Sequence, residues 1–227
     1  PGKVIKNREV FPDLAIEQIL DGTSDTGIQI ATVDNIEMFS SEEQSYISET
    51  LLDHCSSGCV LLANAREKFG EIDETRLIDQ LLQYGAAYIV LDNLEKFKEP
   101  DIERIVNSAI ETKNTFSIAD NIAKLHGLSP DIVPSLLIIG FSYIYLAQRA
   151  GAFANPYDAL SHLHADQWEN ADLADAIVEN IHSYHLAPDQ LNEILTKCAQ
   201  NYSTAQKIKQ FDLSHMGLDQ QAIDTLL

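Results

Sequence analysis

Basic residues are scarce in this chain of 227 residues, which has 15 Lys and Arg against 35 Asp and Glu and a formal net charge of −20 at pH 7. Such a charge repels phosphate backbones and anionic lipids, so nucleic acid and membrane surfaces are disfavoured as partners. No Lys or Arg occurs from residue 9 to 65 or from residue 150 to 196. Either these acidic stretches steer a basic partner, or they are solvated helix faces that prevent aggregation.

Cysteine and long apolar runs are also rare. The only cysteines are Cys55, Cys59 and Cys198, an odd number that disfavours a disulfide framework in a chain with ample apolar residues. The most apolar stretch, residues 136–147, is shorter than the roughly 20 residues of a membrane span, and we expect no signal peptide at the start of the chain. The sequence predicts a cytoplasmic protein without a membrane span, and export or delivery to another cell is the alternative.

The chain does contain an internal repeat. Segments 34–39, 92–97 and 120–125 share an Asp, an Asn, an apolar residue, two further residues and a second apolar residue. Weaker copies fill the remaining chain, so that one anchor residue recurs every 27 to 31 residues. The anchors are Asn7, Asn35, Asn64, Asn93, Asn121, Arg149, Asn180 and Lys207. A period of roughly 20 to 50 residues is the signature of repeat proteins.

A second marker runs in step with the anchors. Each anchor is followed by a proline or capping residue with an acid, which is typical of a helix start. Examples are Pro12-Asp13, Ser41-Glu42, Pro100-Asp101, Pro130-Asp131, Pro188-Asp189 and Leu218-Asp219. These acids also recur every 27 to 31 residues, so coincidence is a poor explanation.

Apolar residues between the two markers follow helical spacing. Leu77, Ile78, Leu81 and Leu82 form a one-sided stripe, and a break such as Gly85 precedes a second helix. A single helical hairpin is too small to bury both stripes, so consecutive hairpins stack. We therefore predict an all-α fold, an α-solenoid of about seven hairpins of ~29 residues. It forms one domain over residues 1–227, and we expect it to be a segment of a longer array.

The repeats resemble short HEAT-type hairpins. In addition, residues 127–133 (Gly-Leu-Ser-Pro-Asp-Ile-Val) are similar to the repeat junction of the TAL-effector family. The junction match covers one repeat, whereas the period covers essentially the whole chain. The resemblance implies helical-hairpin geometry, and it makes a nucleic-acid-binding repeat protein of TAL-effector type the alternative function, which the negative charge opposes.

Asparagine recurs at the anchors although its helix propensity is mediocre. A functional explanation is a ladder of amides on a concave face that contacts a partner. A structural explanation is that each amide satisfies a backbone group of the adjacent hairpin. The candidate partner-binding or repeat-ladder residues are Asn35, Asn64, Asn93, Asn121 and Asn180. We also expect Phe39, Phe69, Phe97, Leu125, Phe153, Tyr184 and Phe211 to be buried at equivalent places.

Catalytic motifs are thin, and the chain has neither a phosphate-binding glycine loop nor a dinucleotide fingerprint. Cys55 and Cys59 with His54 match structural zinc spacing poorly. His162, His164, His182 and His185 could bind a metal or sense pH if a hairpin brought them together, or they are surface histidines.

We therefore predict a non-enzymatic scaffold or adaptor without a cofactor. A curved repeat array presents a long surface that binds a protein or peptide partner, and the acidic stretches favour a basic one. The second alternative is a small metal-dependent enzyme that uses the four histidines, for which no pairing of a base with a nucleophile is visible.

Overall fold

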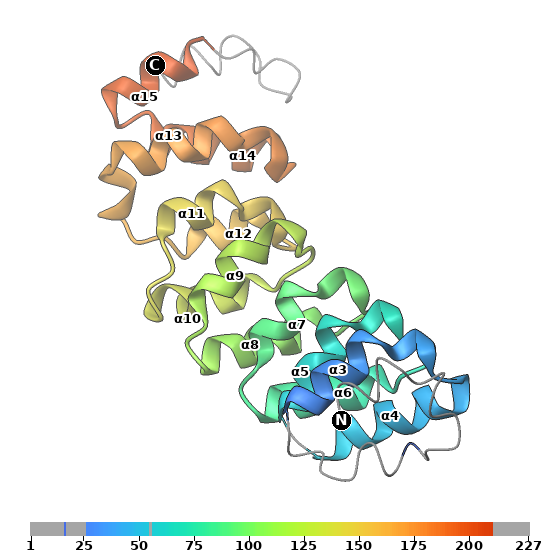
Figure 1. Ribbon diagram of the computed structural model, residues 1–227. Helices are drawn as coiled ribbons and strands as arrows, with labels where there is room; N and C mark the ends of the chain where they lie inside the picture. The colour runs from blue at the N-terminus through green and yellow to red at the C-terminus, as the bar shows by residue number, and fades with distance from the viewer. Residues whose placement is uncertain (1–15, 17–25, 55, 211–227) are drawn as a thin grey trace. The chain divides into compact units, whose positions relative to one another are not determined.

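The computed structural model describes residues 16, 26–54 and 56–210 (Figure 1). Every regular element among them is helical, which confirms the predicted all-α class, and the one isolated backbone bridge joins Leu128 to Phe153. The anchor Asn7, the aromatic Phe211 and the helix starts at Pro12 and Leu218 lie outside the described residues. The chain divides into two compact units, Pro1–Thr112 and Lys113–Leu227.

The first unit contains two pairs of consecutive helices flanked by α3 and α8. In these pairs α4 packs against α5 and α6 against α7; in addition α3, α5 and α7 pack one on the next, and α4 packs on α6. Its elements are α3 (Thr26–Asp34), η2 (Ile36–Met38), α4 (Ser41–His54), α5 (Ser56–Asn64), η3 (Arg66–Lys68), α6 (Glu74–Gln83), α7 (Ala87–Asp92), η4 (Leu94–Lys96) and α8 (Ile102–Glu111). The η elements are single 3-10 turns.

Side-chain caps explain where the helices of the first unit begin. The carboxylates of Asp73 and Asp101 accept hydrogen bonds from the backbone N–H groups of Arg76 (2.9 Å) and Arg104 (3.1 Å). Three residues of the predicted stripe, Leu77, Ile78 and Leu81, are buried on α6, whereas Leu82 is half-buried. Gly85, with φ of +69°, then supplies the left-handed turn to α7.

The second unit repeats this order. Its elements are α9 (Thr115–Asn121), η5 (Ile122–Lys124), η6 (Pro130–Ile132), α10 (Val133–Ile138), α11 (Tyr143–Gln148), η7 (Ala150–Ala152), α12 (Pro156–Ser161), η8 (Gln167–Glu169), α13 (Ala171–Asn180), η9 (Ile181–Tyr184), α14 (Pro188–Cys198) and α15 (Tyr202–Ile208). Helix α13 packs against α11, α14 and α15. The longer connection between α12 and α13 buries Trp168, whose indole N–H donates to the carbonyl of Leu163 at 3.4 Å.

The predicted sealing residues are buried. Phe39, Phe69, Phe97, Leu125 and Phe153 each follow a 3-10 turn in extended backbone, and Tyr184 is the last residue of η9. The Tyr184 hydroxyl donates to the carbonyl of Ala147 at 2.5 Å. The prediction of equivalent buried positions is therefore confirmed for the six that the structure describes.

Candidate binding surface

The anchor asparagines lie where the helices end at 3-10 turns. Asn35, Asn93, Asn121 and Asn180 each donate a side-chain N–H to the carbonyl four residues earlier, at 2.8 to 3.0 Å. The last carbonyls of a helix lack intrahelical partners, and these amides satisfy one of them. Recurrence of Asn is thus explained by a bond within its own helix rather than to the backbone of the adjacent hairpin.

Asn64 differs from the other anchors. Ala65, not Asn64, directly precedes the 3-10 turn η3, so Asn64 lies one residue earlier than its counterparts. Its side-chain Oδ1 accepts a hydrogen bond from Nδ2 of Asn93 at 2.9 Å, which joins α5 to α7. The predicted ladder therefore has one direct rung between neighbouring hairpins, and contact of these five residues with a partner stays a prediction.

We call α5, α7, α9, α11, α13 and α15, together with α3, the second helices, and α4, α6, α8, α10, α12 and α14 the first helices. Their exposed faces differ in charge. Within the described residues, no second helix contains Lys or Arg before Lys207, whose ammonium binds Asp175 (2.6 Å) and Glu179 (3.3 Å). First helices do contain cations: Arg76 on α6 and Arg104 on α8 pair with acids of the preceding first helix.

An apolar side chain recurs at one sequence position of the second helices in each unit, and we call these residues the apolar row. In five second helices, an apolar residue lies five positions before the residue that immediately precedes the following 3-10 turn. These side chains are exposed or half-buried: Ile30, Val60, Tyr88, Phe116 and Ile144. Counted from the anchor Lys207, Tyr202 takes the same place, whereas Asp175 interrupts the row on α13. Phe116, at 84%, has the highest exposed fraction among the large apolar side chains of the described residues.

In the first unit this row borders a groove of about 440 Å³ between α5 and the start of α7. Its walls are Val60 and Leu61 on one side and Tyr84, Ala86 and Tyr88 on the other. Ser56, Ser57, Thr26 and Gly85 complete the lining. The groove is therefore apolar at its sides and polar at the helix N-termini.

A row of acidic residues lies one helical turn beyond the apolar row. Asp34, Asp92, Asp120 and Glu179 are exposed in the last turns of α3, α7, α9 and α13. Asn64 and Gln148 hold the equivalent positions on α5 and α11. A carboxylate at a helix C-terminus opposes the helix dipole, and Glu179 offsets this cost by pairing with Lys207 at 3.3 Å.

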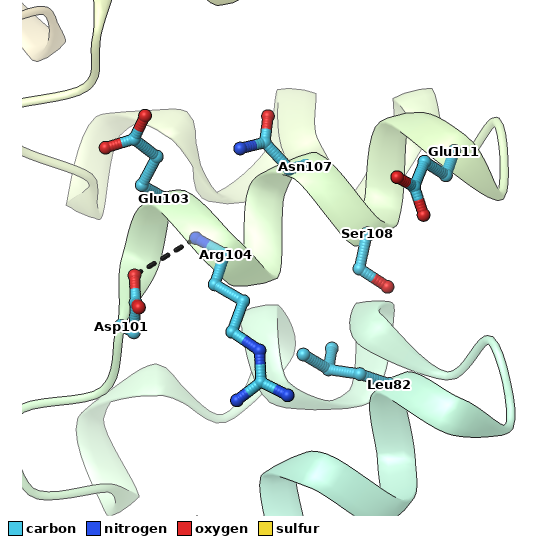
Figure 2. Close-up of a pocket in the computed structure, with 7 residues that line it drawn as sticks. All are labelled: Leu82, Asp101, Glu103, Arg104, Asn107, Ser108 and Glu111. Carbon is cyan, nitrogen blue, oxygen red and sulfur yellow. Dashed lines mark hydrogen bonds between the residues drawn. The ribbon is translucent and has the colours of Figure 1, made fainter.

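A second hollow, of about 580 Å³, lies on the first helices α6 and α8. Arg104 and Ser108 extend toward Leu82 of α6, while Glu103 and Asn107 point away from it (Figure 2). The Arg104 guanidinium pairs with Asp79 at 2.6 Å. Its seven lining residues include no His, Cys, Lys or Tyr, and within the described part of the chain its carboxylates do not form a group that could hold a metal ion.

The predicted histidine and cysteine sites do not assemble in the described residues. No group of three or more His, Cys, Asp or Glu in this part of the chain could hold a metal ion, so His162, His164, His182 and His185 are not brought together as ligands. Cys55 lies outside the description. Burial raises the pKa of the Cys198 thiol to about 12, with the nearby charge of Asp175 adding to the effect, so this thiol stays protonated at neutral pH.

Sequence reasoning missed the apolar row although its signal was present. The apolar residues recur at a fixed distance before the residue that precedes each turn, so the repeat itself contains the signal. The sequence shows which residues form the row, but only the structure shows that their side chains are exposed, because an apolar residue in an amphipathic helix is normally assigned to the core.

Comparisons with known proteins add no relative: no protein family, curated protein or solved structure matches the chain. Among the described helices, none is both long and apolar enough to cross a membrane.

Proposed function

We propose that this chain is an α-solenoid of about seven helical hairpins that binds a protein or peptide partner on the exposed face of its second helices, without catalysis. The packing within each unit supports the solenoid, since α3, α5 and α7 contact in succession, as do α11, α13 and α15. Side chains about one repeat apart also join these neighbours, as in Gln29 with Ser57 (3.0 Å) and Asp175 with Thr204 (2.8 Å).

The apolar row carries the proposal for binding. Of the side chains in this row, Ile30 and Tyr88 in the first unit and Phe116 and Tyr202 in the second are exposed, so apolar groups at one repeated position face solvent on both units. Rows of aromatic side chains are enriched at protein interfaces, where their burial supplies most of the binding free energy.

Charge separates this proposal from its nucleic-acid alternative. A protein that tracks a phosphate backbone places Lys and Arg along the contacting face. The described second helices from α3 to α13 contain none, and the row beside the apolar residues is acidic. A protein surface is therefore the better match.

Site-specific photo-crosslinking tests the proposal. A photoreactive phenylalanine analogue at Phe116, on the second helix α9, should capture a discrete protein in the native cell. The same analogue at Ile138, on the first helix α10, is the matched control, because Ile138 is 83% exposed and Phe116 84%. Equal adducts at both positions, or adducts with nucleic acid at Phe116, would contradict the proposal.

A further inference from the structure

We propose that the groove between α5 and α7 receives an amphipathic helix of the partner protein. The apolar face of that helix packs between Tyr84 and Tyr88 on one wall and Val60 and Leu61 on the other, and its Lys or Arg lies beside Asp34. This assignment names the partner class of the proposed function and rests on it. The elements that form the groove all belong to the first unit.

The groove suits an apolar side chain held between an aromatic wall and an aliphatic one. Tyr84 and Tyr88, which are 49% and 37% exposed, lie with Ala86 on one side, and Val60 and Leu61 of α5 lie on the other. Tyrosine rings cover apolar groups of a partner while their hydroxyls stay in water, at low cost in side-chain entropy. The lining predicts an aliphatic or aromatic residue of the partner in the groove.

Charge determines the other face of the partner. Four residues separate Tyr88 from Asp92 and Ile30 from Asp34, so each acid lies about 6 Å along the helix from its apolar neighbour. Helices α3, α5 and α7 contain no Lys or Arg, and the C-terminal ends of helix dipoles favour cations. Beyond these helices Lys96, in η4, is paired with Glu67 at 3.2 Å, so we expect a cation of the partner to bind beside Asp34.

Spacing favours a helical partner over a strand. Packed helices lie about 8 to 10 Å apart, so apolar rungs on neighbouring second helices recur at about that distance. In a helix, residues seven apart lie on one face and are about 10.5 Å apart. In a strand that distance is about three residues, and an odd number places the side chains on opposite faces. A polyproline II segment also repeats every third residue at about 9 Å, so the experiment must distinguish it.

Selection from a displayed peptide library provides the test, with the full chain as bait. The library combines three frames, an amphipathic heptad, a strand-like alternation and a PxxP repeat, each with Lys, Glu or Gln at the flanking polar positions. We expect enrichment of the heptad frame with Lys. The selected peptide, synthesised and labelled, is then titrated by fluorescence anisotropy.

Two pairs of variants locate the peptide. Tyr88→Ala should weaken its binding at least about tenfold, as for a central interface aromatic, whereas Tyr46→Ala on the first helix α4 should leave it within about twofold. Tyr46 is a matched control because it is 41% exposed. Asp34→Asn should weaken binding and reduce its salt dependence, and Glu42→Gln on α4 should do neither. Far-ultraviolet circular dichroism verifies that each variant is folded.

Three results would overturn the inference: enrichment of Glu flanks, enrichment of the alternating or PxxP frame, or no enrichment above the Tyr88→Ala bait. An equal loss for Tyr46→Ala and Tyr88→Ala would also overturn it. Crosslinks from Phe116 in the second unit report separately on the proposed function, so a failed peptide class and a failed binding surface give different outcomes.

Discussion

At the scale of single residues, Asn93 shows how one amide serves two purposes. Its Nδ2 donates to the carbonyl of Ile89 at 2.9 Å, which ends its own helix, and to Oδ1 of Asn64, which fixes the neighbouring second helix. A buried amide without such partners would cost about 1 to 3 kcal/mol. The hydrogen bonds therefore explain why Asn is retained where helix propensity disfavours it.

A buried ion pair links three segments of the first unit. Oε1 of Glu74 accepts from Nε (2.9 Å) and Nη2 (2.6 Å) of Arg66, and Oε2 accepts from the backbone N–H of Lys98 at 2.7 Å. The two side chains are only 7% and 14% exposed.

Glu74→Ala would leave the guanidinium buried without its carboxylate, so we expect the free energy of unfolding, measured with urea, to fall by about 3 kcal/mol. Asp79→Ala, which breaks the half-exposed pair with Arg104, is the control and should cost less than about 1 kcal/mol. Equal losses would contradict the assignment.

The pair of Asp175 and Lys207 predicts a pH dependence. Burial alone would raise the pKa of Asp175, but hydrogen bonds from Lys207 and Thr204, with the Lys207 charge, lower it below its ordinary value of 3.8. The stabilisation is therefore complete above that value and is lost as the pH falls through the lower folded pKa. The hydrogen bond to Asp175 also raises the pKa of Lys207, so its contribution persists up to its ordinary value of 10.5 and is lost above it.

Urea unfolding of Asp175→Asn should thus show a stability deficit at neutral pH that shrinks as the pH falls below 3.8. The exposed Asp166, replaced by Asn, is the control and should show no such trend. A deficit that stayed constant down to strongly acidic pH would mean that the charge of Asp175 is not what stabilises this pair.

At the scale of elements, close approach of helices depends on glycine at one position. A Cβ on Gly58 of α5 would lie 2.4 Å from the carbonyl oxygen of Leu51 on α4. Gly58→Ala should therefore force α5 away from α4 and cost about 1 to 3 kcal/mol, measured by thermal or urea unfolding. Gly70→Ala is the matched control for Gly58→Ala and should cost much less stability, because nothing lies within 4 Å of its added methyl group and its φ is not positive. A neutral Gly58→Ala would show that the two helices are not in this contact in solution.

Much at this scale could be predicted from the sequence. Pro-acid markers correctly placed helix starts, since α8 begins after Asp101 and α14 begins at Pro188. The buried aromatics were also predictable, because they recur with the period. The pairing of Arg66 with Glu74 was not, because it depends on how a 3-10 turn aims a side chain across a loop. Nor was the register of Asn64, which the one-residue shift to Ala65 changes.

At the scale of the whole molecule, the charges are distributed by element. In the described residues the cations occur on first helices and in turns, as with Arg76, Arg104 and Lys96, and the second helices before Lys207 have none. Net charge keeps a protein soluble, but it does not require this segregation. A surface that selects a basic partner needs few cations of its own, so this distribution of charge agrees with the proposed function.

The solenoid proposal makes a prediction about cooperativity. Phe97 is 7% exposed and closes the turn η4 in the first unit, so Phe97→Ala should cost about 3 to 5 kcal/mol, as for other buried aromatics. Because each hairpin of a solenoid is stabilised by its neighbours, the loss should be local. Native-state hydrogen exchange should show reduced protection within the first unit while residues distant from position 97 in the second unit keep theirs. Phe116→Ala, at an exposed position, should leave exchange unchanged. If protection instead fell uniformly across both units at one common free energy, the chain would unfold as a single cooperative helical core, and its stability would not be a sum of nearest-neighbour terms.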